Sequence, residues 1–71
     1  MANPMRIQVN GEFREVDLPL TIQDLIGVLS LRQERLAIEL NGAVIRRSEW
    51  AHTMLKANDR IEIVHFVGGG C

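Results

Sequence analysis

Two asparagine-glycine pairs, Asn10-Gly11 and Asn41-Gly42, constrain the fold of this chain more than any other feature. An Asn-Gly pair readily adopts the two positive φ angles of the tight turn that joins neighbouring antiparallel strands. Each pair stands between segments in which apolar and polar residues alternate, the period of a strand with one buried face. The sequence therefore predicts two hairpins, over residues 5–18 and 36–45.

The first hairpin has one irregular position. Its returning strand is predicted over residues 12–18, where Val16 and Leu18 share one phase of the alternation and Phe13 falls in the other. A sheet buried on one face accommodates this pattern in two ways. Either the strand contains a bulge, or Phe13 is exposed.

One helix is predicted between the hairpins. Pro19 ends the preceding strand, and Thr21 stands three residues before Asp24, the spacing of a capping box in which each side chain bonds the other residue's backbone amide. We therefore expect the helix to begin near Ile22. Its apolar residues lie at i, i+3, i+4 and i+7 and form one stripe suited to pack on a sheet: Ile22, Leu25, Ile26 and Leu29.

The rest of the chain supplies a short helical turn and a last strand. Ser48 is the expected cap of the turn over residues 49–51, where Trp50, together with Leu55, closes one side of the core. A turn at residues 58–59 then leads into the longest strand candidate, residues 60–67.

This order of elements predicts an α+β domain of the β-grasp (ubiquitin-like) type. Such a domain has a mixed sheet of four to five strands, one main helix and a short helical turn. Its two end strands lie parallel in the middle of the sheet, and the helix covers their crossover. We expect the domain to span residues 1–67 and a flexible glycine tail to follow at residues 68–71.

The composition of the chain restricts the classes of partner that it can bind. Eight basic and nine acidic residues give a net charge of −1, and neither sign forms the block that nucleic acid would require. No apolar run approaches the roughly 20 residues of a membrane span, and the N-terminal segment lacks the pattern of a secretory signal, so we expect a cytoplasmic protein. His52 and His65 have no nearby ligands to complete a metal site, and we expect no bound metal or cofactor.

Three segments resemble the ThiS family, the sulfur carriers of thiamine (thiazole) biosynthesis. They are residues 9–12 (VNGE), residues 40–50 (LNGAVIRRSEW) and residues 58–70 (NDRIEIVHFVGGG). The resemblance implies a protein substrate rather than an enzyme. In that family a ubiquitin-activating (ThiF) type of enzyme uses ATP to adenylate the terminal glycine carboxylate. Sulfur transfer then gives a thiocarboxylate, and a thiazole synthase (ThiG type) consumes the sulfur.

Carried to this chain, the resemblance makes Gly70 the acyl site, with Gly68 and Gly69 threading into the partners' active sites. Glycine suits this passage because it has no Cβ. The family ends in glycine, however, and here Cys71 follows Gly70. Either a peptidase removes Cys71 from a precursor, or Cys71 is an added handle for labelling, or its thiol accepts sulfur as a persulfide. The persulfide is the least favoured because no neighbouring cation activates the thiol. Gly70 is thus the predicted acyl site only after removal of Cys71.

The last strand also predicts a docking surface. Ile61 and Ile63 fit the buried phase, whereas Val64 and Phe66 fall in the opposite phase, on the uncovered face of a one-layer sheet. We expect this apolar patch to meet the activating enzyme. Alternatively, the patch packs within the sheet and the nearby arginines are solvated charges. Three arginines are candidate polar contacts at the rim of the patch: Arg46, Arg47 and Arg60.

Two rival functions stay open. The small subunit of molybdopterin synthase has the same fold and tail chemistry, although the segment over residues 41–50 favours the thiamine branch. The second rival is a ubiquitin-like interaction module or protein modifier, whose tail is joined to lysines and which has no sulfur chemistry.

Overall fold

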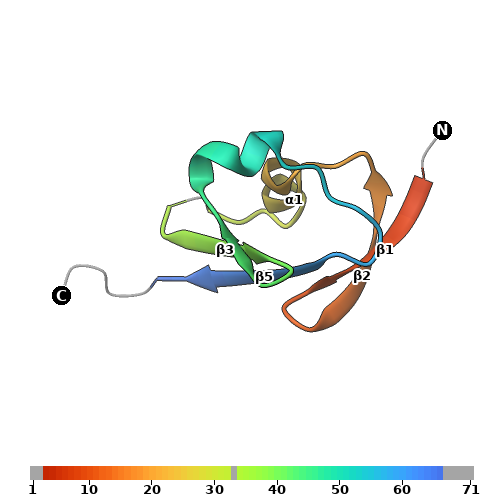
Figure 1. Ribbon diagram of the computed structural model, residues 1–71, viewed down its shortest axis with the longest axis horizontal. Helices are drawn as coiled ribbons and strands as arrows, with labels where there is room; N and C mark the ends of the chain where they lie inside the picture. Colours follow the sequence, from red (N-terminus) through yellow and green to blue (C-terminus); the bar gives the residue numbers. More distant parts are fainter. Residues whose placement is uncertain (1–2, 33, 67–71) are drawn as a thin grey trace.

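The computed structural model describes residues 3–32 and 34–66. Two hairpins and a last strand form the sheet, and two helices lie on one side of it (Figure 1). The elements are β1 (Asn3–Val9), β2 (Glu12–Leu18), α1 (Ile22–Val28), β3 (Leu36–Leu40), β4 (Ala43–Ile45), the 3-10 helix η1 (Arg47–His52) and β5 (Arg60–His65). The predicted α+β class and the order of the elements are confirmed.

The structure of the first hairpin shows which of the two alternatives for Phe13 is correct. Asn10 and Gly11 have φ angles of 50° and 83°, the left-handed conformation that the turn requires. β1 and β2 pair residue for residue over their whole length, so the strand has no bulge. Phe13 lies on the uncovered face and is 66% exposed, with the guanidinium of Arg6 at 4.8 Å from its ring centroid. The exposed Phe13 is therefore the correct alternative.

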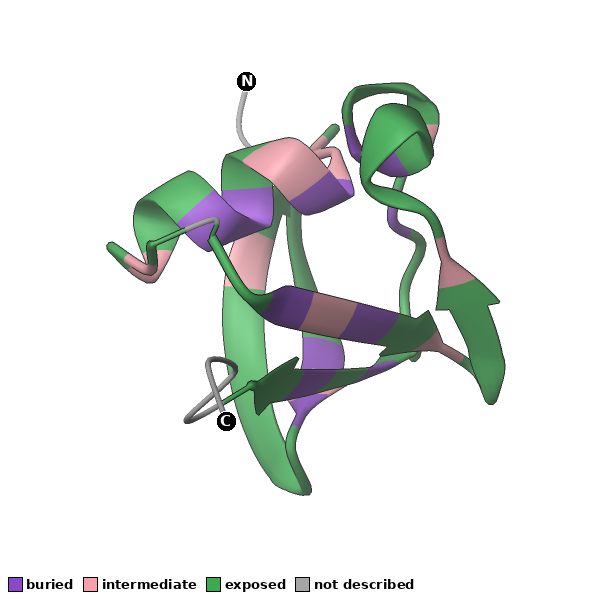
Figure 2. Ribbon diagram, turned by 90° about the vertical axis from the view of Figure 1, so that its left-hand side faces the viewer, coloured by how far each residue is buried: buried purple, intermediate pink, exposed green. Residues whose placement is uncertain are grey.

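Helix α1 begins at Ile22, as predicted. Thr21 is the N-cap, and both bonds of the capping box are present. The Asp24 amide donates to Thr21 Oγ1 at 3.0 Å, and the Thr21 amide donates to Asp24 Oδ2 at 3.1 Å. The apolar stripe lies over the sheet (Figure 2), with only its last residue, Leu29, partly exposed. The short helix is thereby held by its cap and by packing on the sheet.

The sheet has the strand order β2-β1-β5-β3-β4. β5 is the central strand. It runs parallel to β1 and antiparallel to β3, and the two hairpins form the outer parts of the sheet. The predicted parallel pairing of the two end strands in the middle of the sheet is confirmed.

A single cluster of buried apolar side chains fills the space between the sheet and the helices. It includes the two predicted residues of the last strand, Ile61 and Ile63, and the two that close one side, Trp50 and Leu55. Trp50 is buried although it carries a polar group, because its Nε1 donates a hydrogen bond of 3.0 Å to the carbonyl of Ile45. That bond satisfies the indole N–H inside the core.

The short helical turn differs from its prediction. η1 starts at Arg47, its N-cap is Arg46, and no side chain caps it. The expected cap at Ser48 is therefore wrong, because the chain tightens into a 3-10 helix before it reaches this residue and places Ser48 inside the helix.

Both hairpin turns hold β5 with their asparagine side chains. Asn10 bonds the backbone of Ile63. Asn41 accepts from the Arg60 amide through Oδ1 at 2.9 Å and donates through Nδ2 to Asp59 Oδ1 at 3.0 Å. Asp59 is buried, and its second carboxylate oxygen accepts from the amide of Lys56 at 2.7 Å. β5 is thus anchored at its start by Asn41 and further along, at Ile63, by Asn10.

β5 ends at His65, two residues before the predicted end of the last strand. Phe66 is described but lies outside the strand, and Val67 lies outside the described residues. The boundary expected between a domain at 1–67 and a tail at 68–71 is therefore not covered by the structure. Within the described ranges, neither helix has the length and apolar character needed to cross a bilayer.

Candidate functional site

The candidate site is the end of β5, from which the chain continues toward the predicted glycine tail. Side chains along β5 alternate between the two faces of the sheet, with Ile61 and Ile63 buried beneath the helices. Val64 is 52% exposed on the opposite face. Phe66 follows the strand, is 56% exposed, and lines a hollow with His65 and the loop before β3. The predicted exposure of both side chains is confirmed, whereas their shared face and their docking role stay predictions.

Phe66 is held although it lies beyond the strand. Its amide donates a hydrogen bond of 2.8 Å to the carbonyl of Arg35, which precedes β3 and has a φ of 62°. The next residue, Leu36, pairs with His65. The loop before β3 thus fixes the last described residue of the chain, a contribution of Arg35 that sequence reasoning missed.

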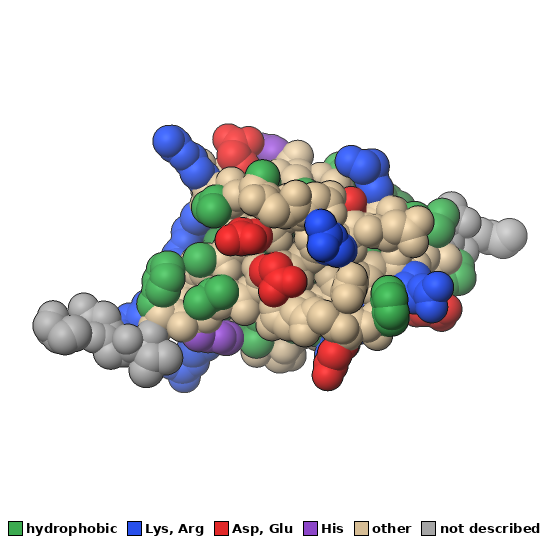
Figure 3. All heavy atoms as spheres, turned by 60° about the horizontal axis from the view of Figure 1, so that its bottom comes forward, with side chains coloured by type: hydrophobic (Ala, Val, Ile, Leu, Met, Phe, Trp, Pro, Cys, Tyr) green, Lys and Arg blue, Asp and Glu red, His purple; other side chains and the backbone are tan. Residues whose placement is uncertain are grey.

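Apolar and charged side chains occupy different parts of the uncovered face of the sheet (Figure 3). Hydrophobic side chains gather near one end of the face, and charged side chains occupy its middle (Figure 3). Arg60 lies in that region, where it lines a shallow hollow together with Val64. The structure therefore brings one of the three predicted rim arginines close to Val64.

The other two arginines lie elsewhere. Arg46 and Arg47 stand where β4 leads into η1, and η1 lies with α1 on the covered side of the sheet (Figure 2). The guanidinium of Arg47 is 5.3 Å from the ring centroid of Trp50, a cation-π arrangement. Both are exposed, but the structure does not bring them to Val64 and Phe66.

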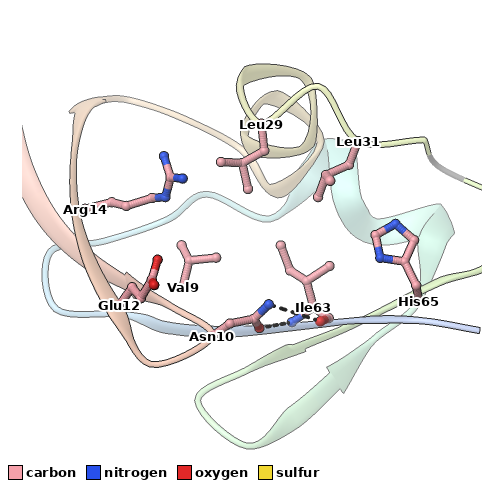
Figure 4. Close-up of a pocket in the computed structure, with 8 residues that line it drawn as sticks. All are labelled: Val9, Asn10, Glu12, Arg14, Leu29, Leu31, Ile63 and His65. Carbon is pink, nitrogen blue, oxygen red and sulfur yellow. Dashed lines mark hydrogen bonds between the residues drawn. The ribbon is translucent and has the colours of Figure 1, made fainter.

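A groove opens on the covered side of the sheet, between the first hairpin and the end of α1 (Figure 4). Its volume is about 250 Å³. Leu29 and Leu31 point down toward Val9 and Ile63 on the sheet, while Arg14 and His65 stand at opposite ends. Sequence reasoning missed this groove because its lining comes from three separate segments, residues 9–14, 29–31 and 63–65, with no shared motif.

The residues that would carry the acyl chemistry are outside the described part of the chain. They are Gly68, Gly69, Gly70 and Cys71. Among residues 3–32 and 34–66, no group of three or more potential ligands could hold a metal ion. His52 and His65 are both exposed, at the ends of η1 and β5.

Known proteins share both the sequence and the fold. The ThiS family model matches residues 7–70. A sulfur carrier protein ThiS from Bacillus subtilis is 42% identical over 50 residues, which are 70% of this chain and 76% of that protein. The crystal structure of a thiamine biosynthesis protein (ThiS) from Geobacter metallireducens superposes with a TM-score of 0.81 at 36% identity, covering 93% of this chain and 100% of that one. The β-grasp architecture is thereby confirmed.

A much longer protein also contains a similar segment. A thiazole synthase from Magnetococcus marinus is 38% identical over 66 residues, which are 93% of this chain. The chain spans only 20% of the length of that synthase. The similarity therefore concerns one segment of the synthase and not its whole length.

Proposed function

The chain belongs to the ThiS family, the sulfur carriers of thiamine biosynthesis, and we propose that it carries sulfur as a thiocarboxylate on Gly70. The observation behind this proposal is that the family match runs through the three glycines and ends at Gly70. A carboxylate on Gly70 requires hydrolysis of the Gly70–Cys71 peptide bond, so a peptidase acts first. The carrier itself supplies no catalytic group.

The chemistry needs an activated carboxylate. A carboxylate oxygen of Gly70 attacks the α-phosphorus of ATP, and pyrophosphate leaves. A sulfur nucleophile at the oxidation level of sulfide then attacks the acyl carbon, and AMP leaves with the former carboxylate oxygen. The product is a thiocarboxylate, whose sulfur is a soft nucleophile. Because glycine has no Cβ, Gly68 and Gly69 place little bulk around the reacting carbon during either step.

Two partners follow from this chemistry. An adenylating enzyme of the ThiF type binds ATP and the tail, and a thiazole synthase of the ThiG type receives the sulfur. A segment similar to this chain within a thiazole synthase supports the second partner. The need for ATP and reduced sulfur supports a cytoplasmic location.

The carrier binds the activating enzyme before its tail reacts. Val64 near the end of β5 and Phe66 just after it are both exposed apolar side chains, close to where the tail begins in sequence, and they are the proposed contacts with the activating enzyme. Arg60 lines the hollow beside Val64 and is the rim contact best placed to meet the same partner. Arg46 and Arg47 reach that partner only if it also extends around the β4 edge of the sheet.

Exchange of labelled pyrophosphate into ATP tests the activation step. A chain ending at Gly70 should support exchange by a cognate activating enzyme, and the chain that retains Cys71 should not. A chain ending at Gly69 is the matched control for tail length. Equal exchange with and without Cys71 would contradict the need for trimming, and no exchange with the chain ending at Gly70 would contradict the adenylation.

A further inference from the structure

The last part of β5 extends beyond the first hairpin. The pairing of β1 with β5 ends at Val9 and Ile61, and the backbone amide of Asn10 adds one bond of 2.9 Å to the Ile61 carbonyl. Among the described residues, no backbone bond joins β5 to this hairpin after Ile61. A groove opens at this point, and its lining includes Asn10, Ile63 and His65 (Figure 4). The end of β5 is therefore open on its β1 side.

The side chain of Asn10 bridges this opening. Its Oδ1 accepts from the Ile63 amide at 2.7 Å, and its Nδ2 donates to the Ile63 carbonyl at 3.3 Å. On the other side, β5 pairs with β3 as far as His65, and the Phe66 amide donates to the Arg35 carbonyl at 2.8 Å. Within the described part of the chain, the end of β5 is thus hydrogen-bonded by β3 on one side and by one side chain on the other.

The position of Ile63 matters because of the residues that follow it. Val64 comes next and is exposed, and Phe66 is the last described residue before the predicted glycine tail. A ribbon of two strands twists more strongly than the same strands inside a wider sheet. Without the bonds from Asn10, β3 and β5 would form such a ribbon at this end. Val64 and Phe66 would then shift relative to the rest of the domain.

We propose that Asn10 is a positioning residue for the adenylation of Gly70. Its side chain orders the end of β5 in the free chain, so that Val64 and Phe66 meet the activating enzyme while the tail enters the active site. Asn10 acts through Ile63 and touches neither ATP nor the reacting carboxylate. Because more of the free chain already has the conformation that binds, the apparent affinity is higher. This inference rests on the proposed function, since the step that it assists is that adenylation.

Kinetics of Asn10 variants test this role. Asn10→Gly keeps the positive φ of the turn, which is 50°, and removes both side-chain bonds. In pyrophosphate exchange with the chain ending at Gly70, KM should rise about tenfold, the scale of one net hydrogen bond. The kcat should stay unchanged, because the enzyme orders the end of the strand once the chain is bound. Asn10→Asp keeps an acceptor for the Ile63 amide and should recover part of the lost affinity.

Asn41→Gly is the matched control for stability. Asn41 occupies the same place in the second hairpin, with a φ of 52°. Its side chain also makes two hydrogen bonds, but to Arg60 at the start of β5 and to the neighbouring Asp59, at the opposite end of the strand from Phe66. Both glycine variants should unfold at a lower urea concentration than the unchanged chain. Only Asn10→Gly should raise KM and speed the hydrogen exchange of the Phe66 amide.

Two results would contradict the positioning role. An equal rise in KM for Asn10→Gly and Asn41→Gly would show that the loss of stability alone weakens the reaction. Faster exchange of the Phe66 amide in Asn10→Gly with an unchanged KM would show that the enzyme does not depend on the order of the strand end. Failure of the proposed function looks different, because the unchanged chain ending at Gly70 would then support no pyrophosphate exchange at all.

Discussion

The side chain of Asn10 forms two hydrogen bonds with the backbone of Ile63, a residue 53 positions away in the chain. Asn10 Oδ1 accepts from the Ile63 amide at 2.7 Å, and Asn10 Nδ2 donates to the Ile63 carbonyl at 3.3 Å. The backbone pairs of β1 and β5 are Gln8 with Arg60 and Val9 with Ile61. The side-chain amide group of Asn10 therefore forms the hydrogen bonds that the next residue would form if the parallel pairing continued. It holds β5 at Ile63, just before Val64.

Replacing Asn10 with glycine tests this anchor. Asn10→Gly keeps the positive φ of the turn but removes both hydrogen bonds, so we expect a loss of about 1–3 kcal/mol in the free energy of unfolding, measured by urea denaturation. Asn58→Gly is the matched control, because Asn58 also has a positive φ, 70°, and its side chain makes no hydrogen bond within the described residues. Equal stability of the two variants would show that the Asn10 side chain contributes only turn propensity.

A second prediction compares two glycines. Gly27 lies within α1, and a Cβ added there would meet no atom within 4 Å. Gly27→Ala should therefore raise the free energy of unfolding by about 0.5–1 kcal/mol, since alanine loses less backbone entropy in a helix. Gly42 has equally open space but a φ of 89°, so Gly42→Ala should lower stability. Thermal unfolding followed by circular dichroism distinguishes the two signs, and a shift in the same direction for both would refute this account.

A third prediction concerns the docking patch. Phe66→Asp should reduce adenylation by the activating enzyme at least tenfold in kcat/KM, because it places a charge in an apolar contact. The far-ultraviolet circular dichroism should not change, because Phe66 is 56% exposed. Phe13→Asp is the matched control on β2, where Phe13 is 66% exposed. Equal adenylation of the unchanged chain and Phe66→Asp would remove the docking role.

Short-range patterns in the sequence predicted the helices and strands, but they could not predict contacts between residues that are far apart in the chain. The capping box of Thr21 and Asp24 located the start of α1, because both bonds join residues three positions apart. The turns at Asn10 and Asn41 were equally visible. Ser48 misled because a single hydroxyl residue is a weak signal for a helix cap, and here the 3-10 helix begins at Arg47, two residues before the predicted start.

The same distinction between short-range and long-range information applies to the candidate site. The exposure of Val64 follows from alternation along β5 and was predictable. Phe66 is exposed as expected, but it lies beyond the end of the strand. The hydrogen bonds of Asn10 with Ile63 depend on the register between β1 and β5, which no local pattern specifies. The support of Phe66 by Arg35 likewise depends on two segments that meet only in the folded chain.

Intact mass spectrometry shows whether Gly70 carries sulfur. The chain ending at Gly70 is incubated with a cognate activating enzyme, ATP and a sulfur donor, and the same mixture without ATP is the control. We expect a mass gain equal to the replacement of one oxygen by sulfur, located on the C-terminal residue and dependent on ATP. A chain that gains no sulfur, or that becomes linked to lysine amines instead, would contradict this expectation.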